Sequence, residues 1–310
     1  MKILLLGCTG FIGKELIIRL IEDNFEIYVV SRKNINSLKR DIPINKIKFL
    51  KLDLSVGDNW QNPNIINYLN EAEGIINLMG EPIADKRWNE IQKKVIENSR
   101  IQTTEYLMDT LRKLQINPKV IINGSAVGFY GTSLSDQFNE NSSAGKDFLA
   151  NLCERWEKAA YKKPFFTRLV ILRIGIVLGE NGGALGKMLP IFRTGFGGPI
   201  GKGDQWMSWI HRTDLCRLII IALKEKRFSG IYNAVAPEPV KMQTFTNTLA
   251  SCLKRPNLIP VPEIMLKILI GDGAKMVLEG QKVVNTKIKN SFFRFDYPLL
   301  EGALFALTKK

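Results

Sequence analysis

Three glycines recur at every third position near the start of the chain, directly after the apolar run of residues 3–6. In such a turn the first glycine lets the chain reverse, the second lets backbone amides approach phosphates, and the third lets the next helix pack closely on the strand. A helix over residues 11–23 would direct the positive end of its dipole at the same point. The spacing therefore predicts a site for the pyrophosphate of a dinucleotide. The residues of this turn that we expect to contact a cofactor are Gly7, Thr9, Gly10, Phe11, Ile12 and Gly13.

The second predicted strand, over residues 26–30, ends in Ser31, Arg32 and Lys33. A site that selects NAD usually has an acidic residue here, which accepts hydrogen bonds from the ribose 2′-hydroxyl. A hydroxyl and two cations suit a 2′-phosphate instead, because the Arg32 fork can bond the phosphate while its plane lies on adenine. A solvated basic turn is the alternative interpretation. We predict NADP as the cofactor.

Apolar, strand-like runs alternate with helical stretches in the first half of the chain. After the first two strands, such runs cover residues 47–52, 74–78, 120–123 and 169–176. This alternation predicts an α/β fold, a doubly wound parallel sheet of the Rossmann type with helices on both faces.

Ligands of such sheets bind beyond the carboxyl ends of the strands. Asp53 and Leu54 follow the third run, where a loop can contact adenine. Leu78 ends the fourth run, and Met79 and Gly80 follow it. We expect these three residues over the middle of the cofactor.

A long helix is predicted over residues 88–113. Its basic residues Lys94 and Arg100 do not share one narrow stripe, so at most one of them needs to face the cofactor. A solvated helix face is the alternative interpretation for either residue.

The composition changes after residue 178, and we assign residues 1–178 mainly to the dinucleotide-binding domain. Nine of the 25 glycines lie between residues 179 and 203, on both sides of a helix predicted over 184–193. Such loops can close over a ligand or simply connect elements tightly. We assign residues 179–254 to a mixed segment of glycine-rich substrate loops and returning Rossmann elements. Residues 255–310, which begin with three prolines followed by an apolar helix, are assigned to a smaller C-terminal domain that forms a substrate lobe.

Residues 208–215 predict the entry into a further helix, with Thr213 or Asp214 near its cap. Trp209 and His211 lie in this entry and are the candidate substrate contacts. Aromatic groups, cations and mobile glycines would meet there beside the C-terminal lobe.

The 310 residues carry a formal net charge of +14, with a hydrophobic fraction of 45%. The cations are spread along the chain without a basic run or an aromatic-rich RNA motif, so an anionic small-molecule substrate explains the charge better than nucleic acid does. No run reaches the length of a transmembrane span, and the apolar start is too short for a signal peptide. A single histidine argues against a histidine metal site, and we expect no bound metal. The scattered cysteines indicate reduced thiols in a cytoplasmic protein; they are Cys8, Cys153, Cys216 and Cys252.

Several motifs together resemble the extended short-chain dehydrogenase/reductases, and more closely their atypical epimerase-like branch. That branch is often labelled nucleoside-diphosphate-sugar epimerase or cell-division-inhibitor-like. The similarity covers nearly the entire chain, including a small C-terminal domain. Motifs of the superfamily are the glycine turn and residues 77–80, 125–131 and 173–179. Motifs of the branch are residues 87–88, 156–157, 182–185, 208–211 and 279–283.

The resemblance implies a Rossmann fold that binds NADP(H), with Ser31 and Arg32 at the 2′-phosphate. It also implies further cofactor contacts. These come from Leu78, Met79, Arg100 and Arg173.

The chain departs from the superfamily at the catalytic Tyr-x-x-x-Lys pair, in which tyrosine is the acid/base and lysine lowers its pKa. On the matching helix, either Phe148 pairs with Leu152 or Leu149 pairs with Cys153, and neither register supplies a tyrosine or a lysine. The groups that could substitute for the pair are Ser125, Tyr130, Lys146 and His211. Ser125 and Tyr130 are the catalytic residues that we predict.

Two functions of different classes remain open. One is an NADP-dependent oxidoreductase or epimerase that acts on an anionic small molecule, for example a nucleotide sugar. The other is a cofactor-binding regulator or assembly factor, for example in cell or plastid division, with little or no turnover. The complete cofactor motif favours the first and the missing pair favours the second, and the fold alone does not decide between them.

Overall fold

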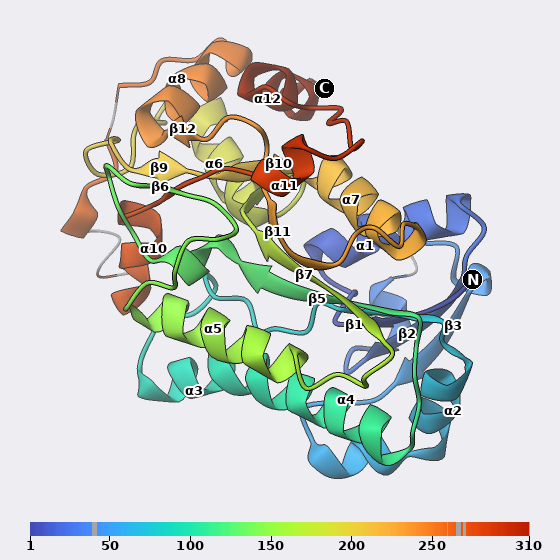
Figure 1. Ribbon diagram of the computed structural model, residues 1–310. Helices are drawn as coiled ribbons and strands as arrows, with labels where there is room; N and C mark the ends of the chain where they lie inside the picture. Colours follow the sequence, from blue (N-terminus) through green and yellow to red (C-terminus); the bar gives the residue numbers. More distant parts are fainter. Residues whose placement is uncertain (39–41, 259, 265–267, 269–270, 310) are drawn as a thin grey trace.

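A computed structural model of the chain describes residues 1–38, 42–258, 260–264, 268 and 271–309. Its centre is a seven-stranded parallel sheet with the strand order β11-β7-β5-β4-β1-β2-β3 (Figure 1). The strand order changes direction beside β1, as in a doubly wound sheet, so the predicted fold class is confirmed. The strands are β1 (Lys2–Leu6), β2 (Glu26–Ser31), β3 (Ile47–Lys51), β4 (Gly74–Asn77), β5 (Val120–Ala126), β7 (Arg168–Ile174) and β11 (Gly230–Ala234).

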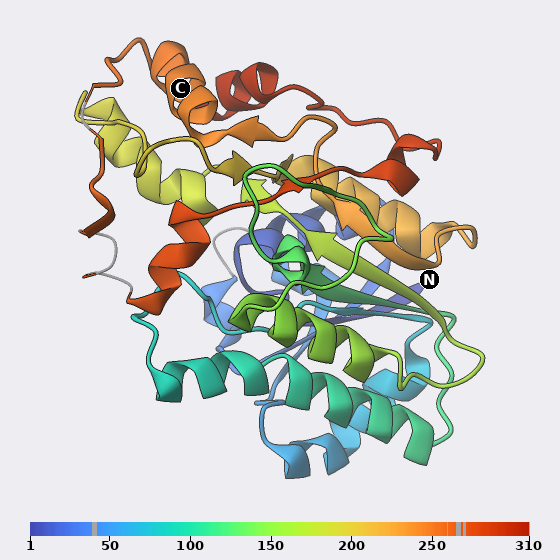
Figure 2. The same cartoon turned by 60° about the vertical axis from the view of Figure 1, so that its left-hand side comes forward.

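Helices cover both faces of this sheet (Figure 2). One layer consists of α1 (Phe11–Glu22) and α7 (Arg212–Lys224). The other contains α2 (Pro63–Glu71), α4 (Ile101–Lys113) and α5 (Phe148–Ala160), and α3 (Glu90–Asn98) precedes α4. Successive strand residues point to opposite faces, so a sheet covered on both sides requires strands that are apolar throughout.

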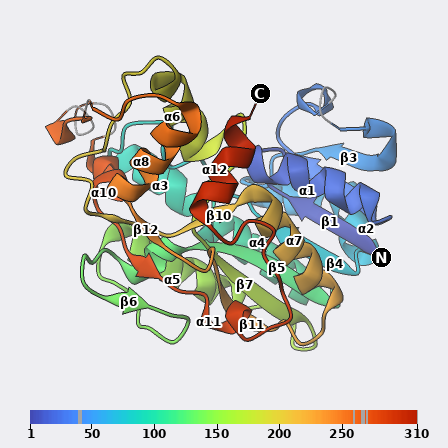
Figure 3. The ribbon, with the colours of Figure 1, turned by 90° about the horizontal axis from the view of Figure 1, so that it is seen from above.

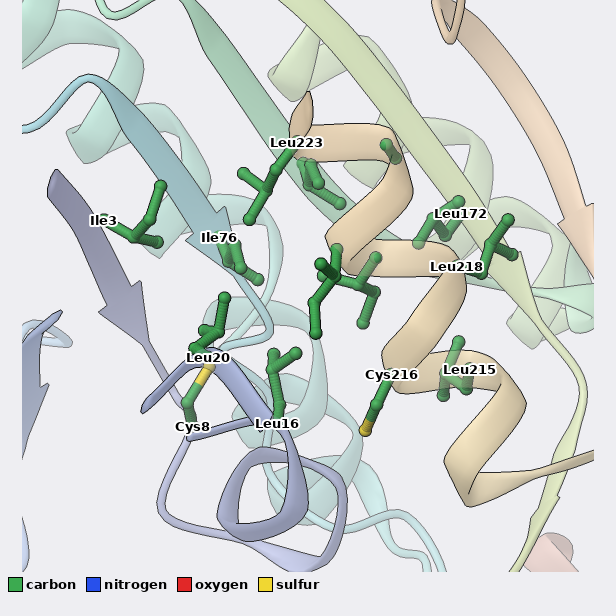
Figure 4. Close-up of a cluster of buried hydrophobic side chains, with 14 of the residues drawn as sticks. Ile3, Cys8, Leu16, Leu20, Ile76, Leu172, Leu215, Cys216, Leu218 and Leu223 are labelled. Atoms are coloured by element: carbon green, nitrogen blue, oxygen red, sulfur yellow. The ribbon is translucent and has the colours of Figure 1, made fainter. Parts of the chain in front are cut away.

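Strand β1 shows this division of side chains clearly. Ile3 and Leu5 pack against the α1–α7 layer, whereas Leu4 and Leu6 pack against the opposite layer, and all four are fully buried. Figure 4 shows Ile3 and Ile76 of the sheet facing the leucines of α1 and α7. Each buried side chain of this size contributes about 1.5–3 kcal/mol through removal from water. Truncating one to alanine would cost about 2–5 kcal/mol.

A second lobe lies beyond the carboxyl end of the sheet. Its core joins α6 (Gly183–Arg193), α8 (Met242–Leu253) and α12 (Leu300–Thr308), which lie close together in Figure 3. Helices on both sides of the predicted boundary at residue 255 therefore share one core. Short strands complete the lobe and its connection to the sheet. They are β6 (Gln137–Phe138), β8 (Ile176–Leu178), β9 (Trp206–Met207), β10 (Trp209–His211), β12 (Val240–Lys241) and β13 (Lys282–Val283). Short helical segments accompany them, η4 (Val127–Tyr130), η5 (Asp272–Ala274), α10 (Lys275–Leu278) and α11 (Thr286–Lys289).

One sequence-based prediction of local structure is wrong. The single helix predicted over residues 88–113 is instead α3 followed by α4, with a break at Ser99. The Ser99 hydroxyl donates to the Ile96 carbonyl and accepts from the Glu81 amide, at 2.9 Å in each case, and such local bonds compete with a continuous helix. Thr213 and Asp214 lie in the first turn of α7, near its cap as predicted, and the N-cap itself is His211, whose imidazole accepts a hydrogen bond from the Thr213 amide at 3.1 Å.

Candidate functional site

Each of the three glycines in the turn between β1 and α1 has a different structural role. Gly7 has φ +73°, and a Cβ there would lie 2.6 Å from the backbone of Met79. A Cβ on Gly13 would lie 2.1 Å from the carbonyl oxygen of Cys8, so this glycine lets α1 pack on the turn. A Cβ on Gly10 would meet nothing within 4 Å. Gly10 is also the N-cap of α1, and no side chain caps this helix. The turn thus leaves open space beside an uncapped, partly positive helix end, which suits an anion.

A small cavity of about 190 Å³ opens at the carboxyl ends of β1, β2 and β3. Residues predicted to contact the pyrophosphate, the adenosine and the middle of a cofactor line it. They are Gly7, Thr9, Gly10, Ser31, Arg32, Asp53, Leu54, Met79 and Gly80.

The polar groups of this small cavity are pre-arranged. The hydroxyls of Thr9 and Ser31 lie 3.1 Å apart, and the Lys33 amide donates to the Ser31 oxygen at 3.1 Å. The Asp53 carboxylate accepts from both the amide and the hydroxyl of Ser55, and these bonds lower its pKa although burial opposes them. The cavity therefore holds an ionised carboxylate on one wall and hydroxyls with a cation on another.

Arg32 lies at the mouth of the small cavity, and its guanidinium is only partly occupied by protein groups. Its guanidinium donates to Glu81 at 2.8 Å, and Lys86 donates to the second oxygen of the same carboxylate at 3.0 Å. These bonds hold the pKa of Glu81 below its usual range. Because 59% of the Arg32 side chain is exposed, it remains available to a further anion.

A larger cavity of about 520 Å³ continues from the small one, with Met79 and Gly80 in the walls of both. Arg100 enters this cavity beside Gly80, where a Cβ would lie 2.8 Å from the guanidinium carbon. The guanidinium lies 5.5 Å from the centre of the Trp156 ring, and burial lowers its pKa. The predicted residues in the walls are Phe11, Ile12, Leu78, Met79, Gly80, Arg100 and Ser125.

Helix α5 carries the two possible pairs of positions at which the superfamily's tyrosine and lysine are absent, and it lies beside this larger cavity. Leu149 and Cys153, one turn apart, both line it, whereas Phe148 packs edge-on against Trp88. Both members of the Leu149–Cys153 pairing therefore line the larger cavity, whereas Phe148 of the other pairing is not among its described lining residues. Burial raises the pKa of the Cys153 thiol to about 12, so the thiol stays protonated and supplies no cation. Leu152, which also lines the cavity, is apolar as well.

Ser125 is the one predicted catalytic residue in a cavity wall. Its hydroxyl donates to Glu157 at 2.7 Å, and the same carboxylate receives two bonds from Arg173 at 2.8 Å each. Arg173 and Glu157 are 2% and 6% exposed, so this is a buried, bidentate ion pair. The Ser125 hydroxyl therefore donates to Glu157, and its oxygen, which lies in hydrogen-bond contact with the Cys153 thiol, has a second lone pair for a ligand.

Tyr130 and Arg173 are not in the walls of either cavity. The Tyr130 hydroxyl accepts from Arg173 at 2.9 Å and donates to Asn233 at 2.6 Å. Burial raises the pKa of Tyr130, and the Arg173 guanidinium lies 3.3 Å from the centre of the Phe129 ring. Both side chains therefore have hydrogen-bond partners within the protein.

The candidate substrate contacts are also core residues. Trp209 is fully buried and donates to the Glu238 carbonyl at 3.0 Å. His211 stacks on Tyr297 with the ring centres 3.9 Å apart, and burial lowers its pKa to about 4. Neither these two nor Lys146 is in the described walls of the two cavities.

Sequence reasoning missed several polar residues of the site. Asp147 and Glu279 line the larger cavity, and Glu81 lines the small one. Two of these had a usable signal, since Glu81 follows the strand-end residues directly and Asp147 precedes an amphipathic helix as an N-cap. Glu279 comes from a distant loop, and only the resemblance marked its motif.

A parallel sheet with this order, a glycine turn at its first strand and two joined cavities at the carboxyl ends define an NAD(P)-binding Rossmann protein. Residues 3–234 match the NAD dependent epimerase/dehydratase family, and the chain belongs to this family. Residues 261–307 match a domain of unknown function, DUF1731. The resemblance to the extended epimerase-like reductases is therefore confirmed.

Relatives extend this match over the whole chain. An epimerase family protein of Arabidopsis thaliana, the chloroplastic SDR39U1 homologue, is 40% identical over 99% of this chain and 86% of its own. The crystal structure of human SDR39U1 with NADPH has a TM-score of 0.86 at 33% identity and covers 99% of both chains. The fold also matches a UDP-glucuronic acid 4-epimerase from Bacillus cereus, with a TM-score of 0.80 at 18% identity over 99% and 98% of the two chains. Across the described part of the chain, the helices are too short or too polar to span a bilayer.

Proposed function

We propose that the protein binds NADP(H) across the two cavities, with the adenosine half in the small one and the nicotinamide half in the larger one. The open space at Gly10 carries this proposal, because it lies beside an uncapped helix end in the wall of the small cavity, and the next residue, Phe11, lines the larger one. The human relative crystallised with NADPH supports the same cofactor.

The residues of the small cavity fit a cofactor with a 2′-phosphate. Ser31 offers a hydroxyl, and Arg32 offers an exposed cation whose partner Glu81 is itself shared with Lys86. The Asp53 carboxylate lies in the next wall, where it would accept hydrogen bonds from neutral donor groups of the adenosine. An acid at the end of β2, which would favour NAD, is replaced here by Ser31.

At the nicotinamide end, the bound cofactor would supply or accept a hydride. Arg100 would hold negative charge near the Gly80 turn, since no carboxylate is within bonding distance in the contacts that the structure describes. Ser125 would orient a hydroxyl through its lone pair. Leu149 and Cys153 move no proton, so an oxidoreductase or epimerase reaction here proceeds without the superfamily's proton relay.

A cofactor-binding regulator is the second candidate function. The apolar Leu149 and the protonated Cys153 favour it, because a positioned acid or base typically contributes about 10²–10⁴-fold to turnover. Steady-state oxidation of NADPH against carbonyl compounds and nucleotide sugars separates the two candidates. Tight NADPH binding without turnover on any of them would favour the regulator.

Gly10→Ala tests cofactor binding directly. A Cβ there contacts nothing within 4 Å, so we expect an unchanged melting temperature, but it fills the space that the pyrophosphate needs. NADPH affinity, followed by the fluorescence of the cofactor, is expected to fall at least about tenfold, or about 1.4 kcal/mol. Gly302→Ala is the matched control, since a Cβ there also contacts nothing and it lies in α12 of the second lobe. Equal NADPH affinity of both variants would contradict the proposal.

A further inference from the structure

The larger cavity extends past Ser125 into a chamber with a mainly apolar wall. Leu149, Leu152 and Trp156 of α5 form one side, and the first residues of η4 and β8, Val127 and Ile176, also line it. The indole nitrogen of Trp156 is occupied, since it donates to the Thr104 hydroxyl at 3.0 Å. These side chains therefore provide apolar contact surface for a ligand but no hydrogen-bond partner.

Charge is confined to the two ends of this cavity. Arg100 is the one cation among its described lining residues, and it lies at the Gly80 end. Asp147 and Glu279 lie at the other end, on either side of the Gly131–Thr132 turn. Asp147 accepts from the Ala150 amide at 2.8 Å, and Glu279 accepts from the Thr132 hydroxyl at 2.9 Å.

This distribution disfavours a nucleotide sugar. A sugar ring against the α5 wall would lose water from its hydroxyls without gaining partners, at a cost of about 1–3 kcal/mol for each group. A diphosphate that reached the far end would face the carboxylates of Asp147 and Glu279 instead of cations. An anionic substrate, as expected from the net charge, would require basic side chains in these walls.

We infer that the chamber binds an uncharged alcohol on an apolar carbon skeleton, with its hydroxyl at Ser125. The Ser125 hydroxyl donates to Glu157 with 2.7 Å between the two oxygens, so the lone pair that does not face the Cys153 thiol accepts a hydrogen bond from an incoming O–H. The carbon skeleton then lies against Leu149, Leu152 and Val127. This inference rests on the proposed function, because the cofactor would occupy the Gly80 side of the cavity.

Titration of the NADP⁺-loaded protein with the 2-alkanols from 2-hexanol to 2-nonanol tests this inference. We expect saturable binding in calorimetry, about fourfold tighter for each added methylene until the chamber is full. UDP-glucose is expected to show no saturable binding to the same complex. Saturable UDP-glucose binding, or a series of alkanols without any saturation, would overturn the inference. Failure of NADP⁺ itself to bind would instead overturn the proposed function.

Substitutions in the chamber wall test whether the alcohol binds there. Leu149→Asn is expected to weaken 2-nonanol about tenfold, and Leu114→Asn, at the far end of α4 and 43% exposed, is expected to leave it unchanged. Val127→Thr keeps the side-chain shape and adds a hydroxyl, so it provides a second test if Leu149→Asn does not fold. Unchanged 2-nonanol affinity in a folded wall variant would place the ligand elsewhere.

Discussion

Arg32 and Glu81 form an ion pair across the mouth of the small cavity, with 2.8 Å between the guanidinium nitrogen and the carboxylate oxygen. They come from the carboxyl ends of β2 and β4, on either side of β1. The pair holds Arg32 beside Ser31, but it also shares the cation that a 2′-phosphate would require. In the proposed binding mode, Glu81 would compete with the cofactor for Arg32.

Glu81→Gln is expected to increase NADPH affinity. An exposed ion pair contributes about 0.2–1 kcal/mol, so releasing Arg32 should tighten binding about two- to fivefold. The increase should shrink at high salt, because exposed charges are screened. Calorimetry at low and high ionic strength measures both effects. A variant that binds NADPH more weakly would show that Glu81 orients Arg32 rather than competing for it.

Restoring the tyrosine–lysine pair should depend on its register along α5. Leu149→Tyr with Cys153→Lys places the pair on the cavity wall, and we expect it to raise NADPH-dependent turnover by about 10²–10⁴-fold. Phe148→Tyr with Leu152→Lys is the matched control, because Phe148 packs on Trp88. Stopped-flow oxidation of NADPH against a carbonyl panel measures the rate. Higher turnover in the control than in the first double variant would contradict the register.

Arg173→Met is expected to destabilise the fold without weakening the cofactor. It leaves Glu157 buried without its ionic partner, a change that costs about 3–5 kcal/mol. Adding Glu157→Gln should recover part of this free energy of unfolding, as measured in urea. NADPH affinity of the folded variants should stay within about twofold of the native protein. A selective loss of NADPH binding would instead place Arg173 at the cofactor, as the resemblance implied.

The lowered pKa of His211 predicts that the folded protein loses stability in acid. Its pKa is lowered by burial to about 4 in the folded protein, against 6.5 for an ordinary histidine, so the unfolded chain binds more protons between these values. Stability from this group is complete above about pH 6.5 and falls by about 2 kcal/mol by pH 5. His211→Asn keeps an N-cap acceptor for the Thr213 amide, and its free energy of unfolding should vary less over this range. Equal slopes for both proteins would show that His211 does not titrate as the structure indicates.

Patterns that depend on near neighbours in the chain predicted much of this structure. The glycine spacing and the apolar strands identified the turn at Gly10 and the parallel sheet, because each element has a characteristic period. The break at Ser99 was not predicted, since it depends on a bond to Glu81 from another element. His211 and Arg173 likewise needed tertiary information, because burial beside Tyr297 and Glu157 decides what they contact. Which α5 side chains line the larger cavity also required the structure, since the sequence permitted both pairings.

The most direct test of the account is calorimetry of NADPH and NADH with the native protein and Arg32→Ala. We expect the native protein to prefer NADPH at least about tenfold, and Arg32→Ala to lose about 1.5–3 kcal/mol of NADPH binding while NADH changes little. Arg227→Ala, whose side chain is 78% exposed away from both cavities, is the control. Equal affinity of the native protein for the two cofactors would contradict the claim that Ser31 and Arg32 form a 2′-phosphate site.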